Sequence, residues 1–426
     1  MKRILKCHFW VILSLVGMSF FLYSCASAVE EDLSEKTYNE NQDDESGTPY
    51  SQVRLTDSQW NTLLWLNYFG SNYIQEVYKS TPNSENSNFF IGRYNIAMML
   101  AMLANGADEE SKKEISQYLG SEIEELNSFF EFATGLLKRS DNQVKFNSAT
   151  SLWLSNNSSV NNGFVDLLKT YYDAEVYSRD LSAGSTKEEI NQWYSNKTEG
   201  MIQEFLKNTL PPAVNMYAGN AVFFNGKWEI PFDKANTRKE IFHSSDGSET
   251  EVEMMHYKEQ MMFYGEPEQG GKVIELSFGN GVYSIILYLP DPAMKIEDAL
   301  PFLSSIDSYC FYYQKKVNLS LPKFSIRSRN DNVKDILSNM GCSGLFGSST
   351  FSGLGALQLS SLSHEAVFEL DESGAKAAAA SGGIHVAHGT IRDYEKVIDL
   401  AFDRPFYFAI TAHSNFILFS GIVNKL

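Results

Sequence analysis

Residues 220–243 read NAVFFNGKWEIPFDKANTRKEIFH, and the stretch opens with a run of apolar and aromatic side chains. Its first part, Asn220 to Trp228, has the length and composition of a β-strand. Further strand-like runs follow towards the C-terminus, at residues 273–289, 317–326, 406–411 and 416–423. Strands are therefore predicted to dominate the second half of the chain.

Helical patterns come before this stretch. Thr56 or Ser58 could cap a helix that runs through Tyr78, and apolar helices are predicted at residues 96–104 and 111–119. No internal repeat and no Pro- or Gly-rich linker interrupts the globular part. We therefore expect one large α+β domain over residues 55–426.

Composition limits the classes of function. The chain has 426 residues, of which 43% are hydrophobic, so it can form a sizeable core. Its formal net charge of -18 argues against a nucleic-acid partner, because phosphate binding requires clustered Lys and Arg.

The N-terminus resembles an export signal. A basic start is followed by an apolar run from Phe9 to Tyr23 and by LYSC at residues 22–25. We predict a lipoprotein signal peptide at residues 1–24, with Cys25 as the lipidated residue that attaches the chain to the cell envelope or outer surface. The alternative is an uncleaved signal anchor through Ala28, and either predicts export.

Residues 25–54 are predicted to be a disordered acidic tether. Within them, residues 30–50 hold eight acidic side chains against one Lys and almost no aliphatic ones. Such a segment cannot bury enough apolar surface to offset the entropy of ordering.

Catalytic and metal motifs are absent from the sequence. It contains no GxSxG, HExxH, Walker loop or GxGxxG motif, so no enzyme is predicted. His385 and His388 have no carboxylate or Cys at a ligand spacing, so no metal site is predicted. Cys310 and Cys342 could form one disulfide, although two buried thiols are favoured.

Several ordered motifs resemble the serpin family of protease inhibitors. They comprise residues 220–243 and six further segments: INQWYSNKTEGMI (190–202), VEMMH (252–256), LPKF (321–324), FSG (351–353), SHEAVFELDESG (363–374) and FDRPFYFAI (402–410). They occur in family order from about residue 58 to the C-terminus.

The resemblance implies the serpin fold. We expect a single α+β domain with a large central β-sheet, smaller sheets, about eight to nine helices and an exposed reactive-centre loop. It also implies a monomer that needs no cofactor and forms a covalent complex with a target serine or cysteine protease.

The resemblance also explains the stretch DESGAKAAAASGGIHVAHG, residues 371–389. The alternation in residues 364–370 before it predicts a half-buried strand. In serpins the loop after the hinge glycine inserts into the central sheet once a protease has cut it. The hinge residues implied here are Glu372, Gly374, Ala375, Lys376, Ala377, Ala378, Ala379, Ala380 and Ser381.

Small side chains suit such insertion. Alternation places Ala375, Ala377, Ala379 and Ser381 towards the core, and Lys376, Ala378 and Ala380 on the other side. An Ala-rich run also forms helices readily and makes ordinary spacers. A segment this short is marginal as an isolated helix, which favours the hinge.

A second group of residues belongs, by resemblance, to the region where the sheet opens. These residues are Asn95, Asn191, Asn220, Trp228 and His364. The family usually reads Ser-Pro-x-Ser at the start of its second helix, where residues 92–95 here read GRYN.

The reactive bond is predicted between His388 and Gly389, because the attacked residue usually lies about fourteen positions after the hinge glycine. Ala387 is the alternative, and an elastase-like or broad-specificity target is favoured. Counting back from FDRPF gives residues 391–394, where Arg392 would suit a trypsin-like protease.

Three hypotheses of function follow. The leading one is an exported, membrane-tethered protease inhibitor. The second is a non-inhibitory serpin-fold surface lipoprotein that acts as a binding or structural protein. The third is an exported enzyme on another fold, for which the sequence supplies no catalytic set.

Overall fold

The computed structural model describes residues 53, 55–156, 158, 160, 162–307, 313–347, 350, 351, 354, 357–375, 396–413 and 415–426. All of them lie in the second of the two units into which the chain divides, Tyr50–Leu426. The predicted lipidation residue Cys25, the loop from Lys376 to Gly389 and Cys310 lie outside the described residues.

The first described helix begins at a capping box. In α2 (Asp57–Ser80), the Thr56 hydroxyl accepts a hydrogen bond from the Gln59 N–H, and the Gln59 side chain accepts one from the Thr56 N–H. The other helices are α3 (Arg93–Ala104), α4 (Glu109–Leu119), α5 (Ile123–Arg139), α6 (Asn162–Tyr172), α7 (Gly184–Lys197), α8 (Ile296–Ala299), α9 (Leu303–Asp307) and α10 (Val333–Asn339). Of the helices that the structure describes, none has both the length and the apolar character that a membrane span requires.

One sheet has six strands in the order β10-β11-β12-β4-β2-β3. The strands are β2 (Val144–Ser155), β3 (Glu175–Arg179), β4 (Met216–Lys227), β10 (Phe324–Asn330), β11 (Leu359–Asp371) and β12 (Gly374–Ala375). β11 also pairs directly with β4, in a parallel ladder from Leu359 and Met216 to Val367 and Phe223. Beyond this ladder, β12 lies between the two strands and pairs with both.

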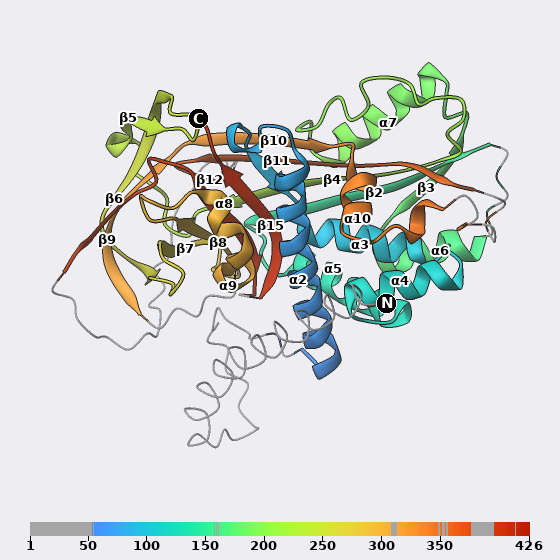
Figure 1. The fold of residues 1–426 in the computed structure, drawn as a ribbon, viewed down its shortest axis with the longest axis horizontal. Helices are drawn as coiled ribbons and strands as arrows, with labels where there is room; N and C mark the ends of the chain where they lie inside the picture. The colour runs from blue at the N-terminus through green and yellow to red at the C-terminus, as the bar shows by residue number, and fades with distance from the viewer. Residues whose placement is uncertain are drawn as a thin grey trace, which may run out of the picture. The chain divides into compact units, whose positions relative to one another are not determined.

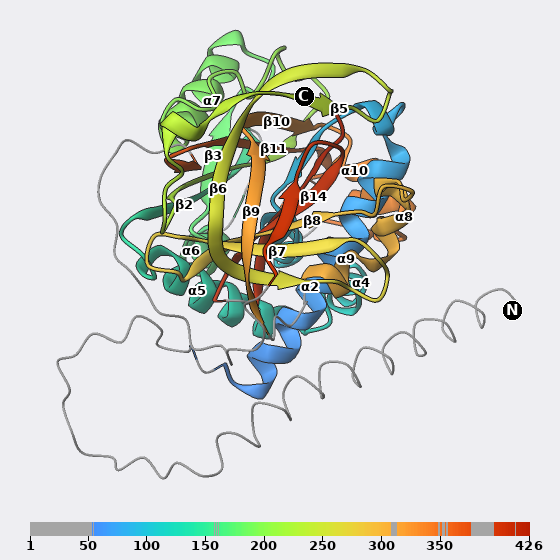
Figure 2. The same ribbon diagram turned by 90° about the vertical axis from the view of Figure 1, so that its left-hand side faces the viewer.

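A second sheet has nine strands in the order β1-β15-β14-β8-β7-β6-β9-β13, with β5 paired to β6. Figure 2 shows β6 and β9 side by side in this sheet. The strands are β1 (Phe89–Ile91), β5 (Arg238–His243), β6 (Glu249–Gly265), β7 (Lys272–Phe278), β8 (Tyr283–Leu289), β9 (Gln314–Pro322), β13 (Ile398–Ala401), β14 (Phe406–Ala412) and β15 (Phe416–Val423).

Two of the runs predicted as single strands each form two strands in the structure. Residues 273–289 form the hairpin β7–β8, whose turn holds Gly279 and Gly281 at φ 56° and 87°. Residues 317–326 divide between β9 and β10, which belong to different sheets. GNG at residues 279–281 and PK at residues 322–323 interrupt the apolar runs, and the predicted strands ran across both of these turn signals.

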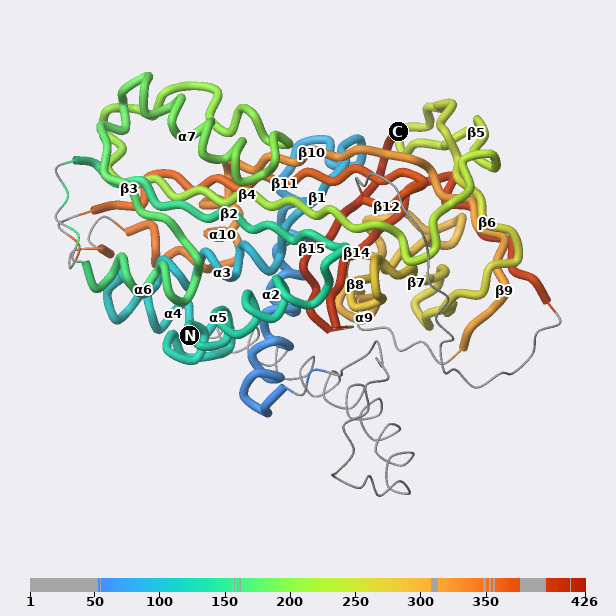
Figure 3. Tube along the Cα trace, turned by 180° about the vertical axis from the view of Figure 1, so that it is seen from behind, coloured from blue at the N-terminus to red at the C-terminus, as the bar shows by residue number. Residues whose placement is uncertain are grey.

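Helices cover both faces of the six-stranded sheet. α7 lies on one face, while α3, α5 and α6 lie on the opposite face (Figure 1), and the view from behind shows the same layers (Figure 3). The segment of residues 198–215 that joins α7 to β4 is called the linker below. On the α7 side, a buried cluster includes Trp153, Tyr194, Phe205, Tyr217 and Val367.

Burial of β11 corrects one prediction. Its alternating sequence predicted a half-buried strand, yet Glu365 and Val367 are 0% and 4% exposed, as buried as Ala366 and Phe368 at 0%. The reason is that the second face is covered by the cluster under α7 and the linker. Strands of a central sheet with two covered faces lose the polar half of the alternation.

Candidate functional site

The predicted hinge starts with a tight turn at residues 372–373, between β11 and β12. The two residues of β12, Gly374 and Ala375, pair antiparallel with residues 370–371 of β11 and with residues 226–227 of β4. The start of the hinge therefore already occupies a strand position in the six-stranded sheet.

Trp228, directly after β4, holds this turn in place. Its backbone N–H donates to the Ser373 carbonyl at 3.0 Å, and its indole N–H donates to the Asp371 carbonyl at 2.9 Å. The Phe232 N–H donates to the Glu372 carbonyl at 2.9 Å. Three carbonyls of the turn are thus bonded to one short segment after β4.

Glu372 adds a buried charged contact at the turn. Its side chain is 6% exposed, accepts a hydrogen bond from the Thr237 hydroxyl at 2.8 Å and lies 3.4 Å from the Lys323 ammonium. Burial opposes ionisation, but the backbone and Thr237 hydrogen bonds and the Lys323 charge together lower the pKa of Glu372. Glu372 is therefore ionised at neutral pH and links the turn to the nine-stranded sheet side of the molecule.

Gly374 fits where no other residue could. Its φ is 137°, and a Cβ atom at this position would lie 2.2 Å from the Gly226 carbonyl oxygen and 2.7 Å from the Lys227 Cα. The next residue, Ala375, is 0% exposed. The geometry requires glycine at residue 374 and leaves room for only a small side chain at residue 375.

His364 joins the two strands of the parallel ladder. It is paired in register with Asn220 of β4, and its Nδ1 lies 3.0 Å from the Asn220 Oδ1. The Gly92 N–H donates to His364 Nε2 at 3.0 Å, so Nδ1 carries the hydrogen and donates to Asn220. Complete burial lowers the pKa of His364 to about 3, which keeps the ring neutral.

Two asparagines extend this network to β2. Asn95 of α3 donates to the Ser148 hydroxyl at 2.5 Å, and Asn220 donates to the Thr150 hydroxyl at 2.8 Å. The structure therefore brings together Asn95, Asn220 and His364, three of the five residues predicted for sheet opening.

The other two predicted residues lie elsewhere. Trp228 lies at the hinge turn, and Asn191 of α7 holds the linker, because its side-chain amide exchanges two hydrogen bonds with the Leu206 backbone at 2.9 and 2.6 Å. Each position has a structural role along the same sheet, but the five residues do not form one cluster.

Arg93 replaces the usual Pro of the family motif and is 1% exposed. It forms an ion pair with Asp307 of α9 and donates to the hydroxyls of Ser71 and Ser420 at 2.7 and 2.9 Å. The start of α3 is thus fixed to α2, α9 and β15. Removing one partner of a buried ion pair strongly destabilises a protein, because the other charge stays buried and unpaired.

Cysteine and metal chemistry adds little to the described part of the chain. Cys342 is a buried free thiol, and burial, with the nearby Glu114 carboxylate, raises its pKa to about 12. Among the described residues, no three His, Cys, Asp or Glu side chains are grouped as a metal site would require.

Comparison with known proteins now identifies the family. The family model "Serpin (serine protease inhibitor)" matches residues 66–426. The chain belongs to the serpin family. Mouse neuroserpin is 30% identical over 80% of this chain and 86% of its own length, and the human plasma serine protease inhibitor is 28% identical over 82% and 87%.

Solved serpin structures share the fold. Serpin48 of the insect Tenebrio molitor has a TM-score of 0.77 at 26% identity and covers 88% of this chain and 100% of its own. Arabidopsis AtSerpin1, in its "native stressed conformation", has a TM-score of 0.76 at 25% identity, with 87% and 99% covered. The predicted α+β serpin fold is confirmed, and the described residues hold nine α-helices, α2 to α10.

Some residues of the hinge region escaped sequence reasoning. Lys323 and Thr237 both lie inside quoted family motifs, but only the fold shows that both contact Glu372. The charge at Arg93 stood out in the sequence as a departure from the family motif. Its partner Asp307 is 214 residues away along the chain, and no spacing rule could connect the two.

Replacing Glu372 should loosen the hinge turn. We expect Glu372→Gln to lower the stability of the native serpin by about 1–3 kcal/mol, because Lys323 loses a buried charged partner. Glu253→Gln is the matched control, since Glu253 contacts the same Lys323 at 2.7 Å but is 59% exposed, and its loss should cost about 0–1 kcal/mol.

The measurement is guanidinium unfolding followed by circular dichroism at pH 7. Equal losses for the two variants would contradict the role assigned to Glu372.

Proposed function

We propose that this serpin inhibits a serine or cysteine protease by presenting the loop after Ala375 as a substrate and then inserting that loop into the six-stranded sheet. One arrangement carries the proposal: β12 lies between β4 and β11, and the sequence continues from it with small residues. The name of the human plasma serine protease inhibitor is consistent with this function.

The chemistry belongs to the target enzyme. Its nucleophile attacks a loop carbonyl and forms an acyl-enzyme, as it would with any substrate. Water can then release the cut loop, or the loop can insert and carry the tethered protease with it. Inhibition requires insertion to be faster than hydrolysis, and this chemistry involves no cofactor.

The sequence of the hinge suits insertion as an extension of β12. Ala375 is buried in the main core, so alternation directs Ala377, Ala379 and Ser381 to the same side. Each of these side chains is small enough to enter a closely packed interior without displacing its neighbours. Lys376 would point to the opposite side if the loop inserted in this register.

We place the reactive bond at His388–Gly389, with Ala387 as the alternative attacked residue. The forward count from Gly374 takes precedence over the count from residues 402–410, because the inserted length must match the sheet. The small apolar side chains of Val386 and Ala387 would suit an elastase-like pocket.

A panel of serine and cysteine proteases tests the proposed inhibition. We expect an elastase-like enzyme to give a covalent band that survives boiling in detergent, and cleavage of the loop to raise the thermal midpoint sharply. The loop adds hydrogen bonds and buried surface once it is inserted. Only clipped chains with an unchanged midpoint would contradict inhibition and support the non-inhibitory alternative.

A pair of charge variants tests the insertion register. We expect Ala377→Arg to turn the inhibitor into a substrate, because insertion would bury an unpaired charge at a cost of several kcal/mol. Lys376→Arg, one residue earlier, keeps a long charged side chain on the opposite side, next to the partly exposed Glu369 in this register, and should keep inhibition. Gel ratios of covalent complex to clipped chain measure both. Equal loss in the two variants would refute the register.

We also propose that the serpin is exported and attached to the cell envelope or outer surface by a lipid on Cys25. The basic start, the apolar run and LYSC support this proposal. Cys25→Ser should abolish incorporation of a labelled fatty acid and release the protein from the membrane fraction. A variant that still sediments with membranes would show that an uncleaved signal anchor holds it.

A further inference from the structure

A continuous line of contacts crosses the six-stranded sheet on its α7 side. It consists of Arg329 on β10, Phe205 in the linker, Tyr194 on α7 and Ser151 on β2, and these four residues are called the strap. The Tyr194 and Ser151 hydroxyls lie 2.7 Å apart. The rings of Tyr194 and Phe205 are stacked, with their centroids 3.6 Å apart.

Arg329 forms the end of the strap on β10. Its guanidinium donates to the Phe205 carbonyl and lies 5.3 Å from the centre of the Phe205 ring. One side chain therefore binds both the backbone and the ring of the same linker residue. Contacts of a guanidinium with a carbonyl and with an aromatic face are each favourable.

The strap lies flat on the sheet because residue 219 of β4 is glycine. A Cβ atom at Gly219 would lie 2.3 Å from the Tyr194 hydroxyl oxygen and 2.8 Å from a ring carbon of Phe205. Gly219 is also the register partner of Ser151. The close approach of Tyr194 and Phe205 to β4 thus depends on the missing side chain.

The two ends of the strap lie on opposite sides of the β4–β11 ladder. Ser151 is on β2, which pairs with β4, and Arg329 is on β10, where it pairs in register with Glu365 of β11. A loop strand that enters between β4 and β11 separates these two pairs of strands. If such a strand enters, the strap must open. The contact between Arg329 and Phe205 is the one that joins the β10 end of the strap to the linker.

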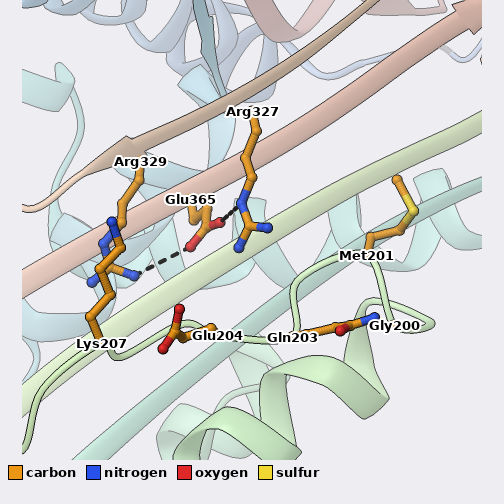
Figure 4. Close-up of a pocket in the computed structure, with 8 residues that line it drawn as sticks. All are labelled: Gly200, Met201, Gln203, Glu204, Lys207, Arg327, Arg329 and Glu365. Atoms are coloured by element: carbon orange, nitrogen blue, oxygen red, sulfur yellow. Dashed lines mark hydrogen bonds and ion pairs between the residues drawn. The ribbon is translucent and has the colours of Figure 1, made fainter.

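Two carboxylates hold Arg329 in this position. Asp331 accepts hydrogen bonds from its Nε and Nη2 at 2.7 and 2.6 Å. Glu365 lies 3.3 Å from Nη1 (Figure 4). Glu365 is 0% exposed and also accepts from Arg327 at 2.6 Å. Because these two carboxylates already fix the guanidinium, it loses little conformational entropy when it contacts the linker.

A cavity lies beside this contact. Its volume is ≈ 700 Å³, and it is lined by Gly200, Met201, Gln203, Glu204 and Lys207 of the linker and by Arg327, Arg329 and Glu365 of the strands (Figure 4). Side chains of the linker and of β10 do not fill the space between them at the cavity. The cavity therefore leaves one side of Arg329 without packed neighbours, whereas Phe205 is 0% exposed within the buried cluster.

We propose that Arg329 is a positioning residue that sets how fast the six-stranded sheet opens to admit the loop, because its contact with Phe205 closes the strap over the line where β4 and β11 part. This inference rests on the proposed insertion mechanism. A tighter strap slows insertion and favours release of cut serpin, whereas a weaker strap speeds insertion at the expense of native stability.

A synthetic peptide tests the strap without a protease. The peptide AKAAAASGGIHV, residues 375–386, should anneal into the sheet of the full-length serpin and raise its thermal midpoint. We expect Arg329→Gln to accelerate annealing about tenfold, which corresponds to about 1.4 kcal/mol on the barrier. Arg327→Gln, which also removes one partner of Glu365, should change the rate by less than about twofold.

A second variant separates the strap from a general loss of stability. Phe205→Leu keeps an apolar side chain but removes the ring beneath the guanidinium, and it should also accelerate annealing. The two residues share one contact, but the Phe205 ring also stacks on Tyr194, so the double variant should accelerate annealing by less than the product of the two single effects. Additive rates, or equal rates for Arg329→Gln and Arg327→Gln, would overturn the strap.

The peptide also distinguishes the two proposals. If the wild-type serpin takes up the peptide at the same rate as Arg329→Gln, the strap is refuted while insertion stands. If only Arg329→Gln takes it up, the strap is supported in its strongest form. If no variant takes it up, the proposed insertion mechanism fails, and the strap fails with it.

Discussion

The parallel ladder between β4 and β11, called the seam below, is where the proposed loop insertion would take place. It joins two long strands directly over residues 216–223 and 359–367, and it ends where β12 begins. β12 runs antiparallel to both neighbours. A strand that continued β12 would therefore replace one parallel ladder by two antiparallel ladders, and antiparallel pairing is slightly the more stable per residue. In the structure, β4 and β11 still pair directly, so the two antiparallel ladders have not formed.

The contacts across the seam are neutral, and charged contacts lie beside it. His364, Asn220 and Asn95 are neutral polar groups linked by single hydrogen bonds, each of which contributes modestly to stability. Glu372 with Lys323 at the hinge, and Arg329 with Glu365 under the linker, are ionic. Under the proposed insertion mechanism the seam parts at these modest neutral bonds, while the charged contacts hold β11 and the turn after it to Arg329 and Lys323.

Motifs and local patterns in the sequence predicted the serpin fold, because its strands and helices depend on neighbouring residues. The capped helix α2, the terminal strands β14 and β15 and the glycine at residue 374 could all be placed from neighbouring residues. Contacts between distant segments could not be predicted in this way. Arg93 with Asp307, Arg329 with Phe205 and the burial of Glu365 depend on how α7, α9 and the linker pack, and no local pattern encodes that packing.

Residues 374 and 375 have one more consequence, which concerns nucleation. Adding a strand to a sheet is slow at its first step, because a free chain must find its register before any bond repays the lost entropy. Here Gly374 and Ala375 are already bonded on both sides, and the turn before them is tied to Trp228. In the proposed mechanism the register is thus set before a protease arrives, and insertion only lengthens a strand that already exists.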